Sequence, residues 1–122
     1  MLPREWVIES YVVEDEKGAI TDFLSFYSLP SSVLKHPVHT ILNVAYSYYN
    51  VPNKHSLTDL TRDALILAKN KGYDVFNALD IQQNEEFLTE LKFGMGDGNL
   101  HYYFYNWRIQ KLQPSDCGIV LV

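Results

Sequence analysis

The sequence predicts an α/β fold of the α+β kind, with a mixed and mostly antiparallel sheet flanked by helices. Short runs of β-branched and aromatic residues recur along the chain, whereas residues 57–71 place their apolar side chains on one helical face. Strands that precede and flank two helices are typical of a helix layer packed on a sheet. The chain has 122 residues, so we expect residues 1–122 to form one domain with a single core.

The first half of the chain indicates a β-hairpin followed by a third strand. Residues 6–13 and 20–29 are rich in β-branched and aromatic side chains, and an acidic, glycine-containing turn at 14–18 separates them. Residues 31–43 are compatible with either a short helix or a loop. Residues 44–51 then resume the strand pattern, so a third strand is expected there.

The clearest helix is expected over residues 57–71. Ser56 is a suitable N-cap, Asp59 follows three residues later, and Gly72 is placed to end the helix. The apolar residues that share one face are Leu57, Leu60, Ala64, Leu67 and Ala68.

The second half predicts shorter elements around a glycine-rich loop. Residues 74–79 read as a short strand, and Asn84 could cap a second helix that turns Phe87, Leu88 and Leu91 inward. The loop at 93–98 leads into residues 100–107, whose sequence LHYYFYNW predicts a long aromatic strand. The final residues 118–122, GIVLV, are expected to form a buried strand.

Composition excludes several classes of protein. Fifteen acidic residues against ten Lys and Arg give a net charge of -5, which argues against nucleic-acid binding. No apolar stretch is long enough for a transmembrane helix, and the N-terminus lacks the pattern of a secretory signal. Cys117 is the one cysteine and has no partner for a disulfide, so we expect a reduced, cytoplasmic protein.

The residues that could carry chemistry are few. Phosphate-binding loops deliver their glycines to a helix N-terminus, whereas Gly94 to Gly98 lead into an expected strand and enclose the anion Asp97. Two interpretations of this loop remain: a turn that needs positive φ angles, or a site that offers a carboxylate to an ammonium or amide group. His36 and His39 lack a nearby third ligand, so no metal is expected. No serine or cysteine stands in a recognisable nucleophile motif.

The C-terminus is unusually apolar. A buried strand at 118–122 would carry the α-carboxylate of Val122 against the core, where burial would raise its pKa toward that of a useful base. The alternative is a strand that simply ends at this residue.

Four segments together resemble one enzyme family. Residues 92–108, KFGMGDGNLHYYFYNWR, resemble the C-terminal signature of the N-myristoyltransferases, or glycylpeptide N-tetradecanoyltransferases. Residues 21–31 (TDFLSFYSLPS), 45–51 (AYSYYNV) and 71–80 (KGYDVFNALD) resemble the same family in the same order. The likeness covers essentially residues 2–122.

The resemblance implies an acyl-CoA N-acyltransferase-like half-domain. Family members carry two such halves in tandem, of which the N-terminal half holds myristoyl-CoA and supplies the oxyanion hole. The C-terminal half, which this chain resembles, supplies most of the peptide groove and the base. On this basis we expect no cofactor bound by this half, with myristoyl-CoA as a co-substrate held by the N-terminal half.

The family pattern also assigns roles to individual positions. The base would be the terminal carboxylate, here that of Val122; family members often end in leucine or glutamine, but the reactive group is main-chain. The positions that would line the peptide site are Ser31, Tyr46, Asn77, Asp97, Gly98 and Leu100.

The function expected from the resemblance is transfer of myristate from myristoyl-CoA to the N-terminal glycine of proteins. Its partners would be peptides with an N-terminal glycine and the N-terminal half of the enzyme, and the chain alone should be inactive. Nine Tyr, six Phe and two Trp suggest an apolar face where that half packs. The alternative is a non-catalytic peptide-binding or scaffold domain of the same fold; an acyltransferase for small amines is a weaker one.

Overall fold

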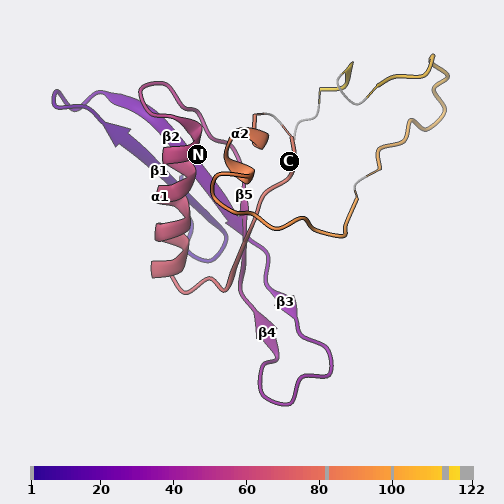
Figure 1. Ribbon diagram of the computed structural model, residues 1–122, viewed down its shortest axis with the longest axis horizontal. Coiled ribbons are helices and arrows are strands. Elements are labelled where there is room, and N and C mark those ends of the chain that lie inside the picture. Colours follow the sequence, from indigo (N-terminus) through magenta and orange to yellow (C-terminus); the bar gives the residue numbers. More distant parts are fainter. Residues whose placement is uncertain (1, 82, 100, 114–115, 119–122) are drawn as a thin grey trace.

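The long helix α1 (Leu57–Asn70) packs on one face of a four-stranded sheet (Figure 1). The computed structural model describes residues 2–81, 83–99, 101–113 and 116–118. The sheet has the order β1-β2-β5-β6, in which β5 runs antiparallel to β2 and parallel to β6. Its strands are β1 (Ile8–Glu14), β2 (Ile20–Ser28), β5 (Val44–Ser47) and β6 (Val75–Asn77). The expectation of a mixed, mostly antiparallel sheet is therefore confirmed.

The β1–β2 hairpin forms where the sequence predicts it. In the connecting turn, Asp15 Oδ1 accepts hydrogen bonds from the backbone N–H groups of Lys17 and Ala19, at 2.9 Å each. Gly18 has a φ of 75°, a conformation that costs glycine little. The carboxylate and the glycine thus fix the tight return of the chain.

The core lies between α1 and the sheet. Along β2, Leu24 and Phe26 are buried and point toward α1, so Tyr27 points to the other side of the sheet, because side chains alternate along a strand. The core cluster consists of Leu24, Phe26, Ala45, Leu60, Ala64 and Ala68.

Both ends of α1 are capped as the sequence predicts. Ser56 Oγ accepts the backbone N–H of Asp59 at 3.0 Å. At the other end, Gly72 has a φ of 86°, and the N–H of Tyr73 returns to the carbonyl of Ala68 at 3.1 Å. This is a Schellman motif, which satisfies carbonyls that would otherwise lack partners.

A buried carboxylate ties the start of α1 to β2. Asp22 is 1% exposed, and its Oδ1 accepts the backbone N–H groups of Asn53, Lys54 and His55 at 2.7, 2.9 and 3.0 Å. Its Oδ2 accepts from Thr21 Oγ1 at 2.6 Å and lies 3.0 Å from His55 Nδ1. Burial alone would raise the pKa of Asp22, but these hydrogen bonds outweigh it and hold the pKa far below its usual range.

The third strand is shorter than expected. It was predicted over residues 44–51, but β5 ends at Ser47. Beyond that point Ser25 Oγ accepts the N–H of Tyr49 and donates to its carbonyl, and Asn50 Oδ1 accepts the N–H of Ser25. One further backbone hydrogen bond, from the N–H of Tyr48 to the carbonyl of Ser25 at 2.9 Å, continues the ladder past Ser47. Side-chain bonds then take its place, and backbone pairing resumes as a bridge between Phe23 and Val51.

Residues 31–43 form neither a helix nor a simple loop. They contain a second sheet of two short strands, β3 (Ser31–Ser32) and β4 (Ile41–Leu42), which pair antiparallel. This β3–β4 hairpin projects away from the rest of the molecule (Figure 1).

The elements after α1 are also shorter than predicted. β6 covers three residues of the expected 74–79, and α2 (Glu85–Leu88) is a single turn. Asn84 does not cap α2 with its side chain, because Asn84 Nδ2 donates to the carbonyl of Leu79 at 2.8 Å instead. The inward direction of Phe87 is confirmed, since it is fully buried.

The prediction of a strand over 100–107 is wrong for the described residues 101–107, which are neither strand nor helix. A strand needs a neighbouring edge for its N–H and C=O groups, and no backbone hydrogen bond to another described segment is found here. Of the strand expected at 118–122, only Gly118 lies within the described residues. Among the described helices, none is both long and apolar enough to cross a membrane.

We predict that Asp22→Asn lowers the midpoint of thermal unfolding by roughly 5 °C or more at neutral pH. The depressed pKa of Asp22 means that its contribution to stability is complete above about pH 4 and is lost as the pH falls. Stability of the variant should therefore fall less steeply than that of the parent between about pH 5 and pH 2. Thermal unfolding followed by circular dichroism over this range measures both effects.

Asp63→Asn is the matched control, because Asp63 is exposed on α1 and its carboxylate makes no hydrogen bond or ion pair within the described residues. Equal pH profiles for the parent and Asp22→Asn would contradict the role assigned to Asp22.

Candidate functional site

The sheet face opposite α1 brings together two of the residues singled out in the sequence. Tyr46 follows the core residue Ala45 on β5 and so points away from α1. In the register of the sheet, Tyr46 stands beside Tyr27 on β2 and beside Asn77 on β6. Three neighbouring strands thus contribute one side chain each to a polar and aromatic row.

The aromatic members of this row are in contact. The rings of Tyr27 and Tyr46 are stacked with centroids 5.3 Å apart, and Tyr48 meets Tyr27 edge-on at 5.5 Å. Burial raises the pKa of Tyr27, and the nearby hydroxyls of Tyr46 and Tyr48 raise it further. Burial also raises the pKa of Tyr48. Tyr27 and Tyr48 therefore remain neutral phenols at physiological pH.

This face offers polar side chains that can form hydrogen bonds. The amide of Asn77 and the hydroxyl of Tyr46 make no hydrogen bond to another described residue, so both can bond to a ligand. Amides and phenols are donors and acceptors for peptide N–H and C=O groups. Tyr27 was not singled out from the sequence, although its position next to the core residue Phe26 on a strand could have indicated its direction.

The other positions are distributed more widely. Ser31 lies on β3 in the second small sheet, is exposed, and pairs with Leu42. Asp97 and Gly98 are exposed on the segment that follows α2, and Asp97 makes no hydrogen bond or ion pair within the described residues. Leu100 and Val122 lie outside the described residues.

One interpretation of the glycine-rich loop is wrong. Gly94, Gly96 and Gly98 were considered for a turn that requires positive φ, but none of the three has a positive φ. A Cβ atom on any of them would meet nothing within 4 Å. The loop therefore does not require glycine for its own backbone, and its role as a carboxylate-bearing site stays a prediction.

A cleft of about 370 Å³ opens on a different part of the molecule, near the end of α1. Tyr73, one of its lining residues, has a buried hydroxyl that lacks a hydrogen-bond partner among the described residues. Neither Tyr46 nor Asn77 lines this cleft. No group of three or more potential metal-ligating side chains is found within the described residues.

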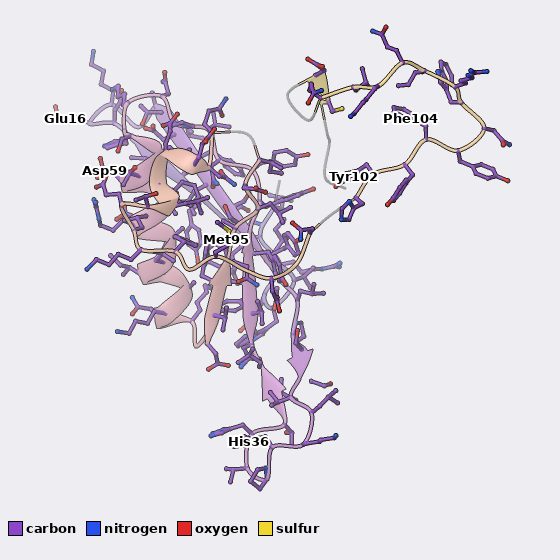
Figure 2. The ribbon with its side chains drawn as sticks, turned by 45° about the vertical axis from the view of Figure 1, so that its right-hand side comes forward. Glu16, His36, Asp59, Met95, Tyr102 and Phe104 are labelled. Carbon is purple, nitrogen blue, oxygen red and sulfur yellow. The ribbon has the colours of Figure 1, made fainter. Side chains whose placement is uncertain are left out.

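An exposed aromatic segment follows the glycine-rich loop. Figure 2 shows Tyr102 and Phe104 on a stretch of chain that stands clear of the sheet and α1. Tyr103 and Tyr105 are 86% and 90% exposed, and Trp107 is 71% exposed. An apolar stretch of this size on a folded chain usually marks a contact surface.

A model of one protein family matches almost the whole chain. It describes the C-terminal domain of myristoyl-CoA:protein N-myristoyltransferase and matches residues 1–120. The chain belongs to the N-myristoyltransferase family. The resemblance seen in the four sequence segments is thereby confirmed.

Individual family members agree with this assignment. The chain is 57% identical over 120 residues to glycylpeptide N-tetradecanoyltransferase 2 of Danio rerio. The aligned region covers 98% of this chain and 24% of the Danio rerio protein. It is similar to a crystal structure of Saccharomyces cerevisiae N-myristoyltransferase with bound myristoyl-CoA, with a TM-score of 0.70 and 45% identity. That match covers 75% of this chain and 25% of the yeast chain. The chain thus spans about a quarter of the length of these relatives.

The wider fold is that of the N-acyltransferases. A ribosomal-protein-alanine N-acetyltransferase from Brucella melitensis matches with a TM-score of 0.55 over 84% of this chain and 74% of its own, at 16% identity. At that identity the likeness concerns the fold alone. The expected acyl-CoA N-acyltransferase-like fold is therefore confirmed.

We predict that substitutions at two adjacent positions on β6 differ strongly in their effect on stability. Phe76 points into the core and contacts Phe26 at a centroid distance of 5.6 Å, so Phe76→Ala should cost about 2–4 kcal/mol. Asn77 points to the opposite face, and Asn77→Ala should change the free energy of unfolding by less than about 1 kcal/mol. Urea unfolding measures both values, and a large loss for Asn77→Ala would show that this side chain serves the fold.

Proposed function

We propose that this chain is the peptide-binding part of an enzyme that transfers myristate from myristoyl-CoA to N-terminal glycine residues. The observation that carries the proposal is the match of residues 1–120 to the C-terminal domain of the N-myristoyltransferases. The placement of Tyr46 and Asn77 side by side on one sheet face supports it, because both belong to the peptide-lining set that the family pattern indicates.

The sheet face that carries Tyr46 and Asn77 is proposed as one wall of the peptide groove. Tyr46 and Asn77 would bond to the peptide backbone, while the stacked ring of Tyr27 offers an apolar surface beside them. Asp97 would attract the cationic N-terminus or basic residues of the substrate, and the net charge of -5 favours basic peptides in general. Ser31, Gly98 and Leu100 complete the proposed set.

The proposed base is the α-carboxylate of Val122. The glycine arrives as an ammonium group and must lose a proton before it can act as a nucleophile. The carboxylate would take that proton, after which the free amine attacks the thioester carbonyl carbon. The new amide bond forms as the carbon–sulfur bond breaks, and the second proton lost by the nitrogen passes to the departing sulfur, so coenzyme A leaves as its thiol. The developing oxyanion needs N–H donors, which we assign to the N-terminal half.

The same N-terminal half is the proposed partner of the exposed aromatic segment, residues 102–109. Six large apolar residues of this segment are exposed. Contact of their apolar surface with water costs free energy, and packing of the N-terminal half over them would remove that cost. Myristoyl-CoA would then be a co-substrate held by that half, and we place the enzyme in the cytoplasm. The alternative is a peptide-binding or scaffold domain that has the fold but no catalysis.

We predict that Asn77→Ala and Asp97→Ala in the complete enzyme each raise the KM for a glycine peptide roughly tenfold. The dissociation constant for myristoyl-CoA should stay unchanged, because these residues would contact only the peptide. Steady-state kinetics and a direct acyl-CoA binding assay separate the two quantities. Asp63→Ala is the control on an exposed acidic residue. An equal loss of acyl-CoA affinity would contradict the placement of both residues.

We predict that the base depends on the main chain at position 122 and not on its side chain. Val122→Leu keeps the carboxylate and should leave the rate nearly unchanged. Deletion of Val122, or addition of a few residues after it, should slow single-turnover transfer from pre-bound myristoyl-CoA by roughly 10²–10⁴. A folded, extended protein that transfers at the normal rate would remove Val122 from the mechanism.

We predict that the isolated chain binds the separately expressed N-terminal half through the aromatic segment. Tyr103→Ser combined with Trp107→Ser should weaken this binding by at least about tenfold, because both side chains are exposed and apolar. Isothermal titration calorimetry gives the affinity, with Ile66→Ser on the exposed face of α1 as the control. Unchanged binding by the double variant would place the contact elsewhere.

A further inference from the structure

The β3–β4 hairpin carries a tip that neither the fold nor the proposed reaction uses. The hairpin tip, residues 33–41, stands away from the sheet and α1, and His36 marks its end (Figures 1 and 2). Within the described residues, the hydrogen bonds of the tip are local, such as the one from the N–H of Val33 to the carbonyl of Thr40 at 2.9 Å. The tip therefore adds little to the core.

The side chains at the tip are unusually apolar for their position. Leu34 is 85% exposed, Val38 is 74% exposed and Ile41 is 64% exposed. Single exposed apolar residues are common on protein surfaces, but here three of them lie within eight residues on a projecting loop.

The tip is also held in a defined conformation. His36 Nδ1 accepts the backbone N–H groups of Val38 and His39 at 3.3 and 2.9 Å, and the two histidine rings lie 5.0 Å apart. Lys35 adopts a φ of 60°, which bends the chain at the start of the turn. A turn that is ordered in advance loses less entropy when it binds.

The tip differs from the rest of the chain in its charge. No acidic residue occurs between Asp22 and Asp59, although the whole chain carries fifteen. The tip itself contains the cation Lys35. An acidic group, Asp74, bonds next to the base of this hairpin, where its Oδ2 accepts the N–H of Asn43 at 2.9 Å. An acidic protein thus presents an acid-free, apolar and basic projection.

We propose that the hairpin tip docks on the surface of an anionic lipid membrane. Leu34 and Val38 enter the boundary between headgroups and acyl chains, and Lys35 remains at the level of the lipid phosphates. Apolar side chains beside a cation are the chemistry that recognises such a surface. A nine-residue projection offers far less area than a stable protein interface of about 800 Å² per partner, whereas a membrane accepts a small insertion. The attachment is weak and reversible, and it is independent of acyl transfer.

The test uses the full chain with Cys117→Ser, so that a single cysteine introduced by Val38→Cys can carry an environment-sensitive dye. Vesicles of phosphatidylcholine with about one-third phosphatidylserine should shift the dye emission to the blue. In flotation with the unlabelled chain, Leu34→Ser should lower partitioning roughly tenfold. Lys35→Ala should lower it roughly fivefold on these vesicles and not at all on pure phosphatidylcholine.

Ile66→Ser is the matched control, because Ile66 is 53% exposed on α1, away from the tip. Normal partitioning by Leu34→Ser and Lys35→Ala would overturn the proposal. Vesicle binding that is lost with Tyr103→Ser but kept by both tip variants would also overturn it, because the aromatic segment would then be the part that binds the membrane. A dye that responds to poly-glutamate but not to vesicles would instead assign the tip to an acidic protein. If the dye at position 38 is already shielded from water without lipid in a longer protein that contains this chain, the tip instead packs against another part of that protein.

Discussion

The position of α1 on the sheet depends on the buried carboxylate of Asp22. Three consecutive backbone N–H groups before the helix donate to one oxygen, so the approach to α1 is held to β2 independently of the packing of the helix side chains. An unpaired carboxylate at 1% exposure would be very costly, and here its bonds to the backbone, Thr21 and His55 compensate. Ser56 then caps the helix directly after this anchor, and the face of α1 that carries Leu60 and Ala64 meets the sheet as a consequence.

The two faces of the sheet have different roles: one forms the core, and the other carries the residues proposed for binding. Its α1 side is filled by Leu24, Phe26 and the small residues of α1, so that side is committed to stability. Its other side carries Tyr27, Tyr46 and Asn77 on neighbouring strands. Because side chains alternate along each strand, the residues proposed for binding are direct neighbours of core residues in the sequence and yet do not share their environment.

Local patterns were sufficient where local forces decide the structure. The β1–β2 hairpin and α1 follow from residues such as Gly18, Ser56 and Gly72, whose effects act within a few positions. The end of β5 could not be foreseen, because it depends on hydrogen bonds that Ser25 makes with Tyr49 and Asn50, which lie 24 and 25 residues away in the sequence. The aromatic run at 101–107 was read as a strand because its residues favour strands, but propensity does not supply a partner edge.

The residues of the candidate site also differ in how far local sequence could place them. The alternation of side chains could have placed Tyr46 on one face, and only the register of β5 with β6 shows that Asn77 is beside it. Ser31 was placed by family resemblance, and its location on a separate small sheet depends on the unexpected β3–β4 pairing. No pattern within the chain could have indicated that Tyr27 stacks on Tyr46, because the two are joined only through tertiary pairing.

The one parallel pair in the sheet has a consequence for how the protein acquires its proposed binding face. Tyr46 and Asn77 are adjacent on β5 and β6, but the connection between these strands runs through the whole of α1. A parallel pair cannot close through a tight turn, so the two strands need a crossover as long as the one that α1 provides. The pairing of Tyr46 with Asn77 therefore depends on contacts that are distant in the sequence, whereas the β1–β2 hairpin depends on local ones. Substitutions at the boundary between α1 and the sheet, such as at Ala64, can thus disturb the proposed binding face without contacting a ligand.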